Sequence, residues 1–156
     1  MRIEQMTIAE LKDAQVEQAG RVAERKQGEA EAIENLRVME RQHERLRLAS
    51  VDDQVAIGEA NPFSDVEDLA LIHSRQTARA TLITKAKSEI EILQKRVLEA
   101  SRRHERELTT YGNILAELHH REREIARADE ALELQRLREL ARANVAARAE
   151  MAAQAS

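Results

Sequence analysis

The sequence predicts an all-α protein, an antiparallel two-helix coiled-coil hairpin whose second helix is longer than the first. Three observations support this prediction: a seven-residue apolar repeat within residues 66–149, a near absence of aromatic side chains, and one short segment that holds the only proline. A repeat of seven keeps an apolar seam facing one partner helix, which an ordinary amphipathic surface helix does not require. We therefore expect paired helices and not a rounded core.

The second helix is expected over residues 66–149, a stretch with one glycine and no proline. Its seam keeps one frame in alternating steps of three and four residues: Leu69, Ile72, Gln76, Arg79, Ile83, Ala86, Ile90, Leu93, Val97, Ala100, His104, Glu107, Tyr111, Ile114, Leu118, Arg121, Ile125, Ala128 and Leu132. The segment 109–113 leaves an alternative, an elongated three-helix bundle in which the chain breaks near Gly112. Because the seam passes Gly112 without a change of phase, we expect one continuous helix.

The composition fits such a structure and excludes several classes of protein. The chain has 156 residues with one Phe, one Tyr and no Trp, so the bulky side chains that fill a globular core are missing. Charged residues make up 35% and the net charge is −4 with both signs interleaved, which does not predict binding to nucleic acid or to a lipid surface. No cysteine, signal peptide or membrane-spanning stretch is found, so we expect a cytoplasmic protein.

The first helix is expected over residues 7–50, with Thr7 as its N-cap and Glu10 at the capping-box spacing. Its seam is apolar at both ends, whereas polar residues occupy the middle: Gln15, Gln18, Arg25 and Glu29. Gly20 and Gly28 weaken it further, since a helical glycine is about 1 kcal/mol less favourable than alanine. This helix should depend on its partner for stability.

The apolar pattern stops at residues 51–65, which we expect to form an acidic turn because they contain Pro62 and Gly58. From residue 48 to 74 there are six acids and no Lys or Arg. The plain interpretation is a connector that only reverses the chain. The alternative is a contact tip, whose candidate partner-binding residues are Asp52, Asp53, Ile57, Phe63 and Asp65. Ser64 or Asp65 would cap the second helix.

A reversal near residue 58 would place Ile8 near Leu108 and leave the C-terminal part of the second helix without a partner. This overhang keeps an apolar stripe, which indicates an interaction surface. Its candidate partner-binding residues are Ile114, Leu118, Ile125, Leu132 and Leu137.

No chemistry of an enzyme is apparent, and we predict no catalytic, cofactor-binding or metal-binding residues. The sequence lacks a glycine-rich phosphate loop and a nucleophile elbow. His119 and His120 are adjacent on a helix and point about 100° apart, so they cannot chelate one ion together. His43 and His104 lie at seam positions, where we expect them to set the register. Basic pairs such as Lys95–Arg96 are flanked by glutamates, as on a solvated helix face.

A lone hairpin with an acidic Pro-Phe turn and a longer second helix resembles the stalk proteins of bacterial type III export, the FliJ/YscO family. The resemblance covers about residues 8–140. The resemblance rests on the architecture and on the turn Ala60–Phe63, which is followed by a helix start of small residues and by Arg79–Leu82. It rests also on the Leu/Glu/Arg-rich segment Arg121–Arg138. Either flagellar or injection-type export is compatible with it.

The resemblance implies a non-enzymatic stalk that couples a hexameric export ATPase to the cytosolic domain of the membrane export gate. The overhang and the start of the first helix would meet the ATPase ring, and the acidic tip would meet the gate. Export chaperones are further implied partners, and the implied location is the cytoplasmic side of the inner-membrane export machinery.

Two other classes of function remain open from the sequence. One is a self-associating coiled-coil scaffold, a homodimer through the overhang that truncation after Gly112 would abolish. The other is a holdase-like chaperone that offers the apolar stripe to unfolded clients.

Overall fold

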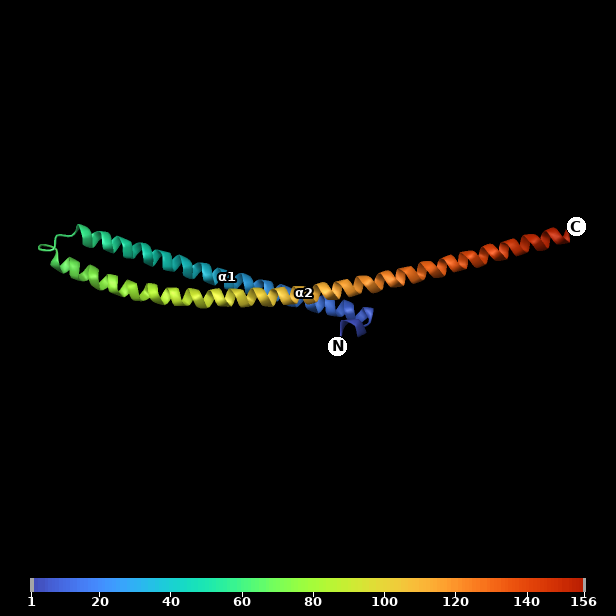
Figure 1. Cartoon of the computed structure of the whole chain (residues 1–156), viewed down its shortest axis with the longest axis horizontal. Helices are drawn as coiled ribbons and strands as arrows, with labels where there is room; N and C mark the ends of the chain where they lie inside the picture. The colour runs from blue at the N-terminus through green and yellow to red at the C-terminus, as the bar shows by residue number, and fades with distance from the viewer. Residues whose placement is uncertain (1, 156) are drawn as a thin grey trace. The chain divides into compact units, whose positions relative to one another are not determined.

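The computed structural model describes residues 2–155. These residues form a short 3-10 helix η1 (Ile3–Gln5) and two α-helices, α1 (Ile8–Glu59) and α2 (Val66–Gln154) (Figure 1). No strand occurs among them. The predicted all-α fold with a longer second helix is confirmed. Because α2 runs through Gly112 without a break, the three-helix alternative is wrong.

Contacts divide the chain into two units, to which both long helices contribute. The hairpin unit is Ala19–Thr109, and the terminal unit is Met1–Gln18 together with Thr110–Ser156. The heptad frame alone does not predict this division, because it runs through both units in one phase.

In the hairpin unit, α1 and α2 lie side by side and antiparallel, joined by residues 60–65 (Figure 1). The predicted end of the first helix at residue 50 and the predicted turn over 51–65 are wrong, because α1 continues to Glu59. The added turns contain no proline, and their buried Asp53 is bonded to α2, so tertiary contacts hold the helix there. The remaining loop has a length that is common between bundle helices.

The connecting segment is held by hydrogen bonds from its own side chains. The backbone N–H of Phe63 donates to Asn61 Oδ1 at 3.0 Å, and the N–H of Asn61 donates to Asp65 Oδ2 at 2.8 Å. Leu69 N–H donates to the carbonyl of Asp65 at 2.9 Å, which places Asp65 at the N-cap position directly before α2. Glu67 and Asp68 occupy the first turn of α2, where acids oppose the positive end of the helix dipole.

In the terminal unit, α1 begins with the predicted capping box. Thr7 N–H donates to Glu10 Oε2 at 2.6 Å, and Glu10 N–H donates to Thr7 Oγ1 at 3.3 Å. The hydrogen bond from the Thr7 backbone lowers the pKa of Glu10. One turn later, Leu11 is fully buried between Ile114 and Leu118 of α2. Smaller contributions to this core come from partly buried side chains: Ile3, Met6, Ile8 and Ala14.

Candidate protein-interaction surfaces

The predicted overhang exists, and it begins where the N-terminal segment ends its contacts with α2. Every residue from Glu122 to Ala155 is exposed. The large apolar side chains of this segment are half to two-thirds exposed: Ile125, Leu132, Leu134, Leu137, Leu140, Val145 and Met151. Of the predicted overhang residues, Ile125, Leu132 and Leu137 therefore lie on an accessible surface.

The other two predicted overhang residues, Ile114 and Leu118, do not. Each is only 5% exposed and packs against Leu11 in the terminal unit. The prediction placed the reversal near residue 58, whereas the chain reverses at residues 60–65, and this moves every pairing toward the C-terminus of α2. Ile114 and Leu118 are core residues and cannot contact a partner while this core is intact.

Arg121 marks the last covered turn of α2. Its guanidinium donates to the backbone carbonyls of Glu4 at 2.8 Å and Met6, and its Nε donates to Glu117 Oε1 at 2.7 Å. The Glu4 carbonyl belongs to η1 and the Met6 carbonyl lies between η1 and α1, so the bonds from Arg121 hold the N-terminal segment on α2. Only one feature of the sequence indicates this role, an arginine at a seam position.

The tip of the hairpin unit keeps some of the predicted contact residues. Phe63 is 92% exposed and Asp52 is exposed, while Ile57 is partly covered. Asp65 is only partly exposed because its side chain holds Asn61. Phe63, with the exposed acids Glu59 and Glu67 close to it in the sequence, is thus the main candidate anchor for a partner at this tip.

Asp53, predicted as a contact residue, is instead buried and only 3% exposed. Arg75 donates to its Oδ1 through Nε at 3.1 Å and through Nη2 at 2.9 Å. Arg79 Nη1 donates to its other oxygen and, at 2.7 Å, to the carbonyl of Ala49. The prediction that Asp53 contacts a partner is therefore wrong, because its buried carboxylate binds α1 to α2. Both arginines lie just after residues 48–74, the segment without Lys or Arg. The composition of that segment therefore does not indicate a partner for Asp53.

The predicted polar middle of the seam forms interhelical pairs in the hairpin unit. Glu29 Oε2 and His104 Nδ1 lie 2.7 Å apart, and the Arg25 and Glu107 side chains approach to 4.0 Å. Hydrogen bonds from Ser101 and then His104 lower the pKa of Glu29. Polar layers of this kind favour one register of a coiled coil over its neighbours.

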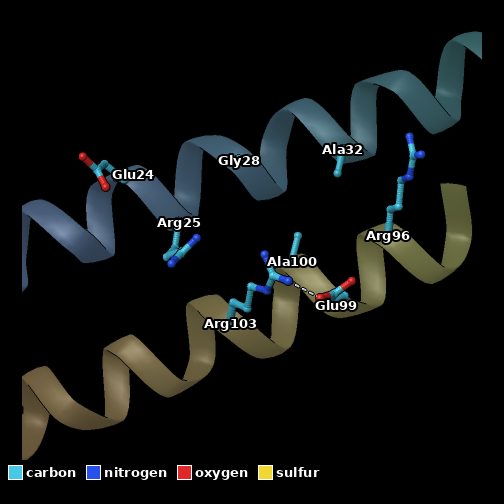
Figure 2. A pocket seen from close by; sticks show the side chains of 8 residues that line it. All are labelled: Glu24, Arg25, Gly28, Ala32, Arg96, Glu99, Ala100 and Arg103. Carbon is cyan, nitrogen blue, oxygen red and sulfur yellow. Dashed lines mark hydrogen bonds and ion pairs between the residues drawn. The ribbon is translucent and has the colours of Figure 1, made fainter.

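Beside this polar layer the helices leave a small groove of about 290 Å³ (Figure 2). Small residues on both helices create it: Gly28, Ala32 and Ala100. Its rim carries both charges, and Arg103 is paired with Glu99. The lining holds three arginines and two glutamates, so the groove has only a small positive excess that would attract an anion weakly.

The described residues give no sign of a metal centre or a membrane span. Within residues 2–155, no group of three or more His, Cys, Asp or Glu is placed to hold a metal ion. Over the same range, neither long helix contains a stretch apolar enough to cross a bilayer. The main candidate sites are Phe63 and the exposed segment 122–154 of α2, because both present large apolar side chains to the surface. In comparisons with known proteins, no protein family, no curated protein and no solved structure matches this chain.

Proposed function

We propose that this protein is a non-enzymatic coiled-coil stalk of a bacterial type III protein export apparatus, which couples a hexameric export ATPase to the cytosolic domain of the membrane export gate. One observation supports the proposal best: the long second helix of a hairpin ends in a segment, Glu122–Gln154, that keeps its helix while its apolar side chains are exposed.

These apolar side chains cover a little more than half of the circumference of the helix, which suits a partner that contacts several of its sides. At about 100° per residue, Leu132 and Leu134 point to nearly opposite sides. Leu137 and Leu140 fill directions between them, and all four are more than half exposed. The exposed segment is about 50 Å long at 1.5 Å per residue. A ring-shaped hexamer could contact such a helix from several sides at once.

The tip would supply the contact with the export gate. Phe63 offers a large apolar side chain, and exposed acids stand near it in the sequence: Asp52, Glu59, Glu67 and Asp68. We expect the complementary surface of the gate to combine an apolar pocket with basic residues. In this proposal the protein acts in the cytoplasm, peripheral to the inner membrane, and also meets export chaperones.

Replacing overhang leucines tests the ATPase contact. We expect the triple variant Ile125→Asp, Leu132→Asp and Leu137→Asp to lose co-purification with the hexameric export ATPase and to lose stimulation of ATP hydrolysis. All three side chains are exposed, so the hairpin should remain folded. Leu82→Asp, at a similarly exposed position of the hairpin unit, is the control and should retain both activities. Undiminished binding and stimulation by the triple variant would refute the proposal.

A further inference from the structure

One face of α2 in the terminal unit is covered in its first part and uncovered in its second. Ile114, Leu118 and Arg121 lie on this face and contact the N-terminal segment. After Arg121 the same face continues in steps of four, four and three residues. Its members are Ile125, Asp129, Leu132, Arg136, Leu140, Ala143, Ala147 and Met151, which we name the stripe.

The stripe repeats every eleven residues, as Ile125, Arg136 and Ala147 illustrate. Eleven residues in three turns give about 3.67 residues per turn, so such positions stay on one narrow side of a nearly straight helix. Its four large apolar members are 50–63% exposed: Ile125, Leu132, Leu140 and Met151. The face that is covered in the terminal unit therefore continues beyond Arg121 as a bare surface.

Charge along the exposed segment is divided between its two halves. Residues 122–133 carry five acids and two arginines, whereas residues 134–155 carry four arginines and two acids. The helix dipole favours acids and bases only in the first and last turns of a helix, and residues 122–133 lie in the interior of α2. The division instead matches a partner helix with the same charges in reverse order.

We propose that the stripe pairs with the stripe of a second copy of this protein, the two helices running antiparallel. With the two-fold axis near residue 138, Ile125 of one copy meets Met151 of the other, and Leu132 meets the region of Ala143. The acidic half of each segment then lies on the basic half of the other. The apolar pairs Ile125–Met151 and Leu132–Ala143 then alternate with two levels that hold a charge, where Asp129 lies at the level of Ala147 and Arg136 at the level of Leu140.

The charged members of the stripe decide the direction of pairing. In a parallel pair in register, Asp129 would face Asp129 and Arg136 would face Arg136 of the second copy, with like charges at the seam. In the antiparallel pair, Asp129 lies beside Arg148 of the second copy, and Arg136 lies beside its Glu139. Opposite charges then meet at both levels.

The oligomeric state of the full chain tests this pairing. Analytical ultracentrifugation should find a concentration-dependent dimer, and the double variant Leu132→Asp, Leu140→Asp should weaken dimerisation at least tenfold. The matched control is Leu134→Asp, Val145→Asp, whose positions lie on the opposite side of the helix and are as exposed. This control should dimerise like the unmodified protein. A monomer at every concentration, or equal loss in both double variants, would overturn the proposal.

The absence of cysteine allows the direction to be measured. Ile125→Cys and Met151→Cys are made separately, mixed, and treated with a short bismaleimide. The antiparallel pair predicts a cross-link between the two variants and little within either one. Efficient cross-linking of Ile125→Cys to itself would indicate a parallel pair and overturn the proposal. Both experiments use the purified protein alone, so their outcome does not depend on the proposed export function.

Discussion

Glu29 of α1 and His104 of α2 lie 2.7 Å apart across the seam of the hairpin unit, between the carboxylate Oε2 and the ring Nδ1. Their side chains are 22% and 16% exposed, so the pair is partly shielded from water. Apolar residues occupy seam positions before and after this level, such as Val22 and Leu36 of α1. A shift of one helix along the other would separate the pair and place each polar group against an apolar layer. The pair therefore fixes the register of the hairpin.

The lowered pKa of Glu29 makes the stability of the hairpin depend on pH. Because the folded pKa lies below the ordinary value of 4.5, the ionised carboxylate stabilises the fold fully above pH 4.5. That stabilisation is lost as the pH falls through the lower, folded pKa. Glu29→Gln should therefore be less stable than the unmodified protein at pH 6, and the difference should shrink on acidification. Urea unfolding followed by circular dichroism between pH 6 and pH 3 measures this.

Glu40→Gln is the control for this pH profile, because Glu40 is an exposed glutamate of the same helix outside the seam. A difference between Glu29→Gln and the unmodified protein that stays constant down to pH 3 would contradict the assigned role of the ionised carboxylate.

Asp53→Asn should destabilise the hairpin unit much more than the neighbouring change Asp52→Asn. The buried Asp53 carboxylate accepts charged hydrogen bonds from Arg75 and Arg79, and such bonds are worth about 1.5–3 kcal/mol each. Both arginines are partly exposed and regain some hydration, so we expect a total loss of about 2–3 kcal/mol. Asp52 is exposed, and its change should cost less than about 0.5 kcal/mol. Equal urea midpoints for the two variants would contradict the stabilising role of the bonds from Arg75 and Arg79 to Asp53.

Features with a local cause could be predicted from the sequence. The capping box of Thr7 and Glu10 needs only a spacing of three residues, and the continuity of α2 through Gly112 follows from the unbroken phase of the seam. The exposed apolar residues Ile125 and Leu132 were also found from periodicity alone.

Features that depend on distant pairing could not be predicted. Acids and Gly58 made residues 51–59 resemble a turn, whereas Asp53 is held in a helix by arginines more than twenty residues away. The reversal of the chain was expected near residue 58 and lies at residues 60–65. This error placed Ile114 and Leu118 on the overhang, whereas they belong to the core. A heptad pattern identifies which face of a helix is buried, but it leaves open which residues of the partner lie opposite.

Leu11→Ala should open the terminal unit. Leu11 is fully buried between Ile114 and Leu118, and truncating a buried leucine to alanine costs about 2–5 kcal/mol. Because this core is small, we expect the start of α1 to detach locally. Hydrogen exchange should accelerate in residues 8–18, while residues 19–109 keep their protection. Val16→Ala, at a position 74% exposed on the same helix, is the control. Unchanged exchange in Leu11→Ala would contradict the importance of this core.

Arg121→Lys should release the segment before α1 even though the positive charge is retained. The planar guanidinium donates at once to the carbonyls of Glu4 and Met6 and to Glu117, whereas a single ammonium cannot span these acceptors. We expect faster hydrogen exchange in residues 3–7, with the helix content unchanged by circular dichroism. Arg123→Lys is the matched control, because Arg123 is exposed and donates to the His119 carbonyl of its own helix at 3.2 Å. If both variants exchange alike, the segment is held by its apolar contacts with the Leu11 core, and the bonds from Arg121 are dispensable.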